Sequence, residues 1–250
     1  MPSDEHPARN AIENSSAKMS TILSLETATR TCSVALHRDG ELLALQEVHL
    51  EKSHSSLLHV MINSLLESAE VERPLLDAIA VSMGPGSYTG LRIGASAAKG
   101  LCYALDLPLI AVDTLKAMAH EVDRHNVHGA WLCPMIDARR MEVFCRLQTS
   151  AANGEPQERL ATQALVIDSE SFREELSQHE IWFFGNGSDK CRPALGSSPN
   201  ARFVPGVYPS ARWVGEIATQ KFRHQEFADV AYFVPLYGKA FYTPPPRPKA

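Results

Sequence analysis

The stretch TILSLETATRTCSVALHRDGELLALQEV, residues 21–48, decides the fold of this chain. It predicts two apolar strands over residues 21–26 and 32–37, and Asp39-Gly40 is a strong signal for a hairpin into a third strand. A second stretch, AWLCPMIDARRMEVFCRL at residues 130–147, repeats the pattern of apolar strand, acidic residue, sharp return and second strand. This duplication indicates two similar α/β domains with a cleft between them.

The remaining elements follow from hydrophobic periodicity and turn residues. Apolar residues spaced by three and four predict a helix that Ser53 can cap and that ends near Ala69. A strand over 77–82 and a helix over 88–105 complete a βββαβα first half, and a strand at 109–112 then leads into a helix towards Val122. The second half is trimmed, and its predicted elements are a loop over residues 150–158, a helix near 170–176, a strand over 181–184, a glycine turn at 185–187 and a helix from 209 to about 223.

These elements divide the chain into four segments. We predict a disordered polar extension over residues 1–18, an N-terminal domain over 19–112, a C-terminal domain over 113–230 and a tail over 231–250 whose proline-rich end from Thr243 is loose. Because the first strand follows Met19 closely, we expect Met19 to be the start of the native protein.

Composition narrows the class of function. The chain has 250 residues, of which 44% are hydrophobic, and a formal net charge of −5, so we expect no strong binding to a nucleic-acid backbone without help from another subunit. No apolar run reaches the roughly 18 residues of a membrane span. The cysteines form no Cys-x-x-Cys pair and lie in apolar segments, which indicates free thiols in a reducing compartment and predicts a cytoplasmic protein. They are Cys32, Cys102, Cys133, Cys145 and Cys191.

The most specific local motif is the glycine loop MGPGSYTGLRIG, residues 83–94. Its glycines let the backbone turn tightly into a helix N-terminus, where free N–H groups and the helix dipole can hold an anion. The loop is not a Walker A motif, because no Gly-Lys-Ser/Thr follows at the required spacing. A tight strand-to-helix turn without a ligand explains the same residues equally well.

Four blocks of sequence, spread in order over residues 21–213, resemble the bacterial TsaB (YeaZ) family. The blocks are LETAT with CSVAL at 25–36, KSHS at 52–55, GPGSYTGLRIG at 84–94, and IDAR with EVF at 136–144. The resemblance implies the fold of the acetate kinase, Hsp70 and actin superfamily, in which two ribonuclease-H-like domains flank a nucleotide cleft.

The resemblance also implies a role. Members act as the non-catalytic partner and activator of the TsaD threonylcarbamoyltransferase, which works with TsaE to modify the adenosine beside the anticodon (t6A) in tRNAs that read ANN codons. We therefore expect a heterodimer with TsaD, contact with tRNA only through the complex, and no membrane. For the isolated chain, the sequence leaves monomer and homodimer both open. No cofactor of its own is implied, and the sequence leaves open whether ATP or ADP binds at the interface of the complex.

Both phosphate turns of the superfamily are degraded in this chain, so we predict no catalytic residue. The first turn has Glu26-Thr27-Ala28-Thr29 where relatives that bind nucleotide use Asp-x-Gly-Thr/Ser, and the second has Asp137-Ala138-Arg139. The residues that remain candidates for anion or nucleotide contact are Glu26, Thr27, Gly86, Ser87 and Asp137.

Two enzymatic functions are alternatives to the non-catalytic role. One is a self-sufficient ATPase or small-molecule kinase in which Glu26 and Asp137 order a metal ion, against which the missing glycines argue. The other is a metalloprotease, which would need His-Glu-x-x-His. Here His54 and His59 are five residues apart, so we predict no metal site.

Two helices are expected to form the partner interface, as the family resemblance implies. The helix from Ser53 has apolar residues on two sides, and the helix after the glycine loop has small residues at every fourth position. Packing within the domain explains both patterns as well, and an ordinary surface ion pair is the alternative for Arg92. The predicted interface residues are His54, Leu57, Leu58, Met61, Leu65, Gly90, Arg92, Gly94 and Ala98.

One motif departs from the family. Relatives often end in Pro-x-Tyr-Leu-Arg, whereas this chain has Pro235-Leu236-Tyr237-Gly238-Lys239. The proline and the tyrosine fit the pattern, and the arginine is missing.

Overall fold

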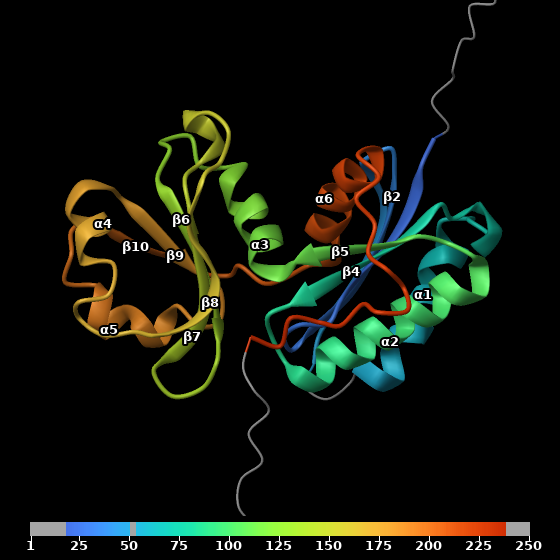
Figure 1. Ribbon diagram of the computed structural model, residues 1–250, viewed down its shortest axis with the longest axis horizontal. Helices are drawn as coiled ribbons and strands as arrows, with labels where there is room; N and C mark the ends of the chain where they lie inside the picture. Colours follow the sequence, from blue (N-terminus) through green and yellow to red (C-terminus); the bar gives the residue numbers. More distant parts are fainter. Residues whose placement is uncertain (1–18, 51–53, 239–250) are drawn as a thin grey trace, which may run out of the picture.

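The computed structural model describes residues 19–50 and 54–238, which form two lobes side by side, each built on a five-stranded sheet (Figure 1). The predicted disorder of residues 1–18, the cap at Ser53 and the loose end after Thr243 lie outside the described residues. None of the described helices is long and apolar enough to cross a lipid bilayer.

The first lobe has the predicted βββαβα order. Strands β1 (Thr21–Glu26), β2 (Thr31–Arg38) and β3 (Glu41–His49) form an antiparallel meander, and β4 (Ala78–Gly84) and β5 (Leu109–Asp113) continue the sheet in parallel with β1. The predicted hairpin signal is confirmed, because Asp39 and Gly40 both have positive φ, as a tight two-residue turn between right-twisted strands requires. The sheet order is β3-β2-β1-β4-β5.

The second lobe repeats this topology. Its strands are β6 (Trp131–Asp137), β7 (Glu142–Gln148), β8 (Glu158–Val166), β9 (Ile181–Phe184) and β10 (Ala201–Val204). Their order, β10-β9-β6-β7-β8, places the third, second, first, fourth and fifth strands of the lobe side by side as in the first lobe. The predicted duplication of a ribonuclease-H-like α/β unit is therefore confirmed. The small helical elements of this lobe are η2 (Ala151–Asn153), α4 (Arg173–Gln178), η3 (Asp189–Cys191) and α5 (Arg192–Leu195).

Two strands of the second lobe are absent from the sequence prediction. The predicted loop over residues 150–158 contains η2 and reaches the start of β8, and neither β8 nor β10 was expected. Both strands lie at sheet edges, and along β8 all the residues are exposed or half-buried. An edge strand with so little burial lacks the apolar alternation from which strands are recognised.

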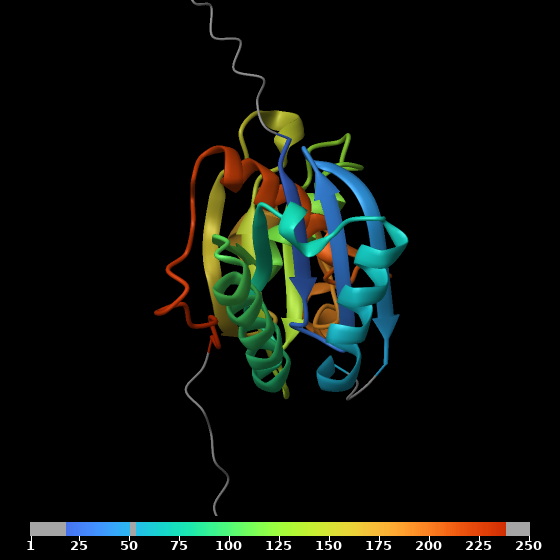
Figure 2. The same cartoon turned by 90° about the vertical axis from the view of Figure 1, so that its right-hand side faces the viewer.

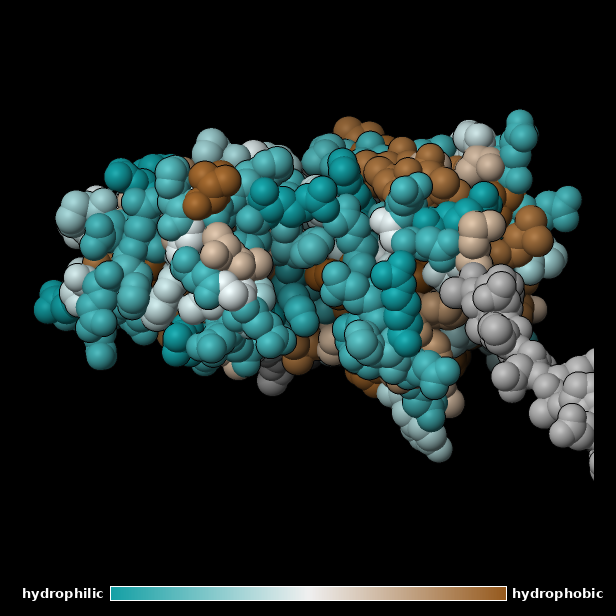
Figure 3. Space-filling model, turned by 90° about the horizontal axis from the view of Figure 1, so that it is seen from above, coloured by the Kyte–Doolittle hydropathy of each residue, from teal (hydrophilic) through white to brown (hydrophobic). Residues whose placement is uncertain are grey.

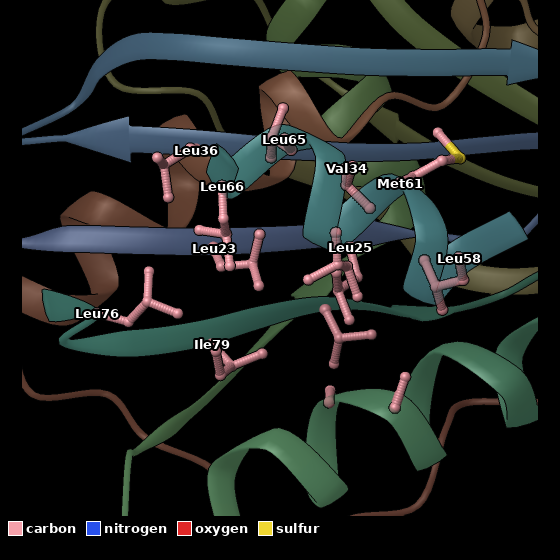
Figure 4. Close-up of a cluster of buried hydrophobic side chains, with 14 of the residues drawn as sticks. Leu23, Leu25, Val34, Leu36, Leu58, Met61, Leu65, Leu66, Leu76 and Ile79 are labelled. Atoms are coloured by element: carbon pink, nitrogen blue, oxygen red, sulfur yellow. The ribbon is translucent and has the colours of Figure 1, made fainter. Parts of the chain in front are cut away.

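Helices α1 (His54–Ser68) and α2 (Tyr88–Leu105) cover one face of the first sheet, with the short η1 (Arg73–Leu75) between α1 and β4. Side chains from α1, the sheet and α2 together form the main core of this lobe, part of which Figure 4 shows. Helix α6 (Ala211–Arg223) covers the opposite face, where Val214 and Ile217 pack on Ile22 and Ala80. The last of the described helices thus returns to the first sheet.

Helix α3 (Thr114–Asp123) lies between the lobes, packed on β6 and beside α6 (Figure 1). Glu216 of α6 accepts hydrogen bonds from Arg124 (2.7 Å) and lies 3.0 Å from His120 Nε2. Seen from above, apolar residues gather over the first lobe, whereas the second lobe is mostly polar on this side (Figure 3).

Candidate functional site

The glycine loop packs directly against the first turn of the chain. The hydroxyl of Thr27 donates a hydrogen bond to the carbonyl oxygen of Gly90 (2.8 Å), and the N–H of Ser87 donates to the carbonyl oxygen of Ala28 (2.6 Å). A Cβ atom at Gly86 would lie 2.2 Å from the Ala28 carbonyl oxygen. Any side chain at this position would push the two segments apart, so the glycine serves close packing within the chain.

Glu26, the last residue of β1, has its side chain buried next to this turn. Its side chain is fully buried, and Oε1 accepts a 2.5 Å hydrogen bond from the N–H of Ala28. Burial raises the pKa of Glu26 to about 7, against the opposing effect of the hydrogen bond from Ala28. A carboxyl group in this environment holds a proton through most of the range below neutrality, and it has no open side from which to order a metal-bound water.

These contacts correct part of the predicted anion site. Glu26 and Thr27 are both fully buried, so neither side chain is accessible to a ligand in this structure. Gly86 is half-buried and Ser87 is exposed, but the N–H of Ser87 is already engaged by Ala28 and its hydroxyl accepts from the N–H of Gly90. An anion contact at Gly86 and Ser87 stays a prediction.

Asp137 belongs to the second lobe, and its described partners do too. Its carboxylate forms an ion pair with Lys190 and accepts a hydrogen bond from the N–H of Arg139 (2.9 Å). Partial burial by itself would raise the pKa of Asp137. The ion pair with Lys190 and the hydrogen bond from Arg139 lower the pKa by more, so the net shift is downward. Lys190 also donates to the carbonyl oxygens of Arg140 and Glu142, both at 2.7 Å. The second turn is thus held by a lysine of its own lobe.

Most of the predicted interface residues lie inside the first lobe, and this is a correction. Leu58, Met61 and Leu65 belong to the main core, where Figure 4 shows them together with side chains from the sheet. His54 is also buried, with Nε2 3.2 Å from the carbonyl oxygen of Thr31. The reason is that α1 packs on β2 and β3 and also lies against α2 on the same face of the sheet, so both sides of its apolar stripe are covered.

The small residues of α2 are buried for a related reason. A Cβ atom at Gly90 would lie 2.1 Å from the carbonyl oxygen of Thr27, and one at Gly94 would lie 2.3 Å from Thr27 Oγ1. Ala98 is fully buried in the core. This stripe fits α2 to its own lobe. Of the predicted set, Arg92 is exposed and Leu57 is half-buried at the edge of the core.

A groove does lie between the outer surfaces of α1 and α2, with a volume of about 660 Å³. Its walls combine apolar side chains, small residues and a polar rim. The lining residues are Ser55, His59, Tyr88, Thr89, Arg92, Ile93, Ser96, Ala97, Gly100 and Leu101. Val60 of α1 and Tyr103 of α2 add further exposed apolar surface on the same two helices, with exposed fractions of 60% and 89%. We call the surface formed by the lining residues the α1–α2 groove.

The sequence held a signal for this groove that the prediction did not use. Arg92, Ser96 and Gly100 are also spaced by four and lie two positions away from the buried stripe of Gly90, Gly94 and Ala98. Residues two positions apart in a helix point in very different directions, so the choice of stripe decides which face meets solvent. A Cβ atom at Gly100 would have no neighbour within 4 Å, which marks this stripe as the open one.

Comparison with known proteins identifies the family. A family model described as TsaD, tRNA N6-adenosine threonylcarbamoyltransferase, matches residues 48–232. The Escherichia coli protein named tRNA threonylcarbamoyladenosine biosynthesis protein TsaB is 32% identical over 224 residues, covering 86% of this chain and 93% of its own length. The Bacillus subtilis protein of the same name is 38% identical over 127 residues, and the matched part spans about half of each chain (51% of this one and 54% of that one).

Solved structures agree with this match. A Pseudomonas aeruginosa structure described as an uncharacterized protein with similarity to peptidase YeaZ has a TM-score of 0.76 and 27% identity, covering 88% of this chain and all of that one. A second structure, YeaZ from Pseudomonas aeruginosa, has a TM-score of 0.72 and 28% identity over the same share of this chain. With the duplicated sheets, the glycine loop and these matches in agreement, the chain belongs to the TsaB (YeaZ) family.

Proposed function

We propose that this chain is a non-catalytic subunit in the biosynthesis of threonylcarbamoyladenosine in tRNA, where it binds and activates a TsaD-type transferase. Relatives named for this pathway support the proposal. The structural observation that carries it is the α1–α2 groove, an open surface of apolar and small residues on two helices of one lobe.

The chemistry of the groove suits the helices of a related subunit. Ile93, Ala97 and Leu101 supply apolar surface, while Ser96 and Gly100 let a second backbone approach closely. Two helices from the partner laid against α1 and α2 would complete a four-helix bundle and bury this surface. Arg92 and His59 at the rim supply charge and hydrogen bonding to set the register.

The closed first turn supports a non-catalytic role. An ATPase or kinase of this superfamily would need Glu26 to face a nucleotide and its metal ion, and the side chain of Glu26 is fully buried. A metalloprotease is opposed by the positions of the two α1 histidines, since His54 is buried and His59 lies in the groove. Within the described residues, no group of three histidine, cysteine or acidic side chains is arranged to hold a metal ion.

The finer features of the proposal follow from the family. The partner is TsaD in a heterodimer that TsaE joins, and the modified position is the adenosine beside the anticodon of tRNAs that read ANN codons. With a net charge of −5, this chain leaves contact with tRNA to the rest of the complex, and ATP or ADP binds at the interface of the complex. The α1–α2 groove also offers a surface for a homodimer when the chain is alone, and the cytoplasm is the location that the proposal expects.

The test reconstitutes modification from the purified chain, its cognate TsaD and TsaE, tRNA and the threonylcarbamoyl donor. Gly100→Arg places a long charged side chain in the groove, and the space around Gly100 lets the isolated chain keep its fold. We expect it to lose both co-elution with TsaD and tRNA modification. Ala161→Arg, on the exposed edge strand β8, is the matched control and should retain both.

Two results would contradict the proposal. Modification that proceeds equally well without this chain would remove the activating role, and ATP turnover by the chain alone would favour the kinase alternative.

A further inference from the structure

The segment after α6 lies along the outside of the first lobe. In Figure 1 it crosses the front of this lobe and ends between the two lobes, and Figure 2 shows it along the edge of the molecule beside α2. We call residues 228–238 the C-terminal strap. Its first part is anchored by the N–H of Ala228, which donates to the carbonyl oxygen of Leu109 (2.8 Å), and by Val230 and Phe233, which pack on the main core.

A lysine of α2 ties the middle of the strap to the helix. Lys99 Nζ donates hydrogen bonds to the carbonyl oxygens of Ala231 (3.0 Å) and Phe233 (3.3 Å). These charge-assisted bonds join two segments more than 130 residues apart in sequence. The strap therefore has a defined course along α2.

The far part of the strap closes over the glycine loop. The N–H of Leu236 donates to the carbonyl oxygen of Met83 (2.6 Å), and Pro235 is buried. Gly84, with a φ of 104°, leaves room for this approach, because a Cβ atom there would lie 2.4 Å from the carbonyl oxygen of Leu236. The first glycine of the loop thus serves the strap, as Gly86 serves the first turn.

The strap then reaches the end of the α1–α2 groove through two aromatic rings. Tyr237 packs on Tyr88, the first residue of α2, with ring centroids 4.6 Å apart. Arg92 lies over Tyr88 as well, with Cζ 5.5 Å from the ring centroid and Nη1 3.4 Å from the Tyr88 hydroxyl. Tyr237 itself does not line the groove, whereas Tyr88 and Arg92 do.

We propose that Tyr237 is a positioning residue of the docking surface, which holds Tyr88 and, through it, Arg92 in the orientation that a partner carboxylate recognises. The inference rests on the proposed function and names the chemistry of the partner at this point. Among the described residues Arg92 forms an ion pair with none, so its charge is available to an acidic side chain of the partner helix. Fixing the rings before binding reduces the side-chain entropy lost on association.

The experiment measures the affinity of the full-length chain for its cognate transferase by calorimetric titration. Tyr237→Ala should weaken binding about three- to tenfold, the range expected for one aromatic pair. Tyr237→Phe keeps the ring and should bind as the wild type. Tyr232→Ala is the matched control, because Tyr232 lies on the same strap with an exposed fraction of 83% and should leave the affinity unchanged.

A double-mutant cycle tests whether the strap acts through Arg92. If it does, Tyr237→Ala combined with Arg92→Ala should weaken binding by less than the product of the two single effects. A double variant whose loss of affinity equals the product of the two single losses would overturn the proposal. So would a Tyr237→Phe variant that binds as weakly as Tyr237→Ala. Thermal unfolding of each variant reports whether a loss of affinity comes from a loss of fold.

The groove variant Gly100→Arg separates this inference from the function on which it rests. If Gly100→Arg abolishes binding while Tyr237→Ala binds as the wild type, the positioning role is wrong and the proposed docking surface stands. If Gly100→Arg also binds as the wild type, the proposed docking surface and the proposed positioning role are both wrong.

Discussion

Gly90 and Thr27 are in direct backbone contact, although 63 residues separate them: the Thr27 hydroxyl donates to the Gly90 carbonyl oxygen, and a Cβ atom at Gly90 would lie 2.1 Å from the Thr27 carbonyl oxygen. This contact joins the glycine loop to the turn that follows β1. Because α2 begins directly above that turn, the loop and the turn stabilise each other.

The first prediction follows from this contact. Gly90→Ala should lower the free energy of unfolding by about 1–3 kcal/mol, because the added methyl group has backbone on its far side and nothing flexible to displace. Gly100→Ala, in the same helix, should instead raise stability by up to about 1 kcal/mol, since its Cβ atom meets open space. Urea denaturation of both variants checks this pair of signs, and equal effects would contradict the packing explanation.

The second prediction concerns the pH dependence of stability. The pKa of Glu26 is raised from 4.5 to about 7 by burial, so the folded chain binds this proton more tightly than the unfolded chain. The resulting stabilisation is complete below pH 4.5 and is lost as the pH rises through about 7, with a slope of up to about 1.4 kcal/mol per pH unit between those values. Glu121, with a pKa also raised to about 7 by burial, contributes in the same direction.

Glu26→Gln tests that linkage. The amide has nearly the shape of the protonated carboxyl group and does not titrate, so stability measured by chemical denaturation at several pH values should lose the part of the slope that Glu26 supplies. A variant with the wild-type slope between pH 4.5 and 7 would show that Glu26 is ionised in the folded state. Glu121→Gln provides the comparison for the remaining slope.

The third prediction separates the buried and exposed sides of α1. Leu58→Ala should destabilise the isolated chain by about 2–5 kcal/mol, because it leaves a cavity in the main core. Val60→Ala, at a site with an exposed fraction of 60%, should change stability by no more than about 0.5 kcal/mol. Thermal unfolding of the chain without its partner distinguishes them, and similar midpoints would mean that Leu58 is not packed as described.

The fourth prediction concerns the second turn. Lys190→Met should raise the pKa of Asp137, because the lysine supplies both a hydrogen bond and a positive charge to that carboxylate. An NMR titration of the Asp137 side chain measures the change. Arg192→Met is the control, since Arg192 pairs with Asp189 and should leave Asp137 unaffected.

Local patterns were sufficient for the strands and helices that carry a strong period. The β1–β2–β3 meander, its repeat at β6–β7, and the helices α1 and α2 were all predicted, because each has apolar residues at the spacing of one element and a turn residue or cap at its end. Edge strands β8 and β10 were not, since their pairing with β7 and β9 supplies what their own sequences lack. The open groove was also missed, because burial of one four-residue stripe in α2 leaves its neighbour exposed, and periodicity is the same for both.

By itself, the sequence determined the family and the duplicated α/β units, both of which reside in contiguous runs of residues. Only the tertiary structure decided which of those residues face outward. Glu26 became a buried acid, the stripe of Leu58 and Gly94 became core, and Tyr237 came to lie on Tyr88, because each outcome depends on which distant segment packs against the residue. Burial is a property of the whole arrangement of α1, α2, α6 and the strap, and no local stretch of sequence contains it.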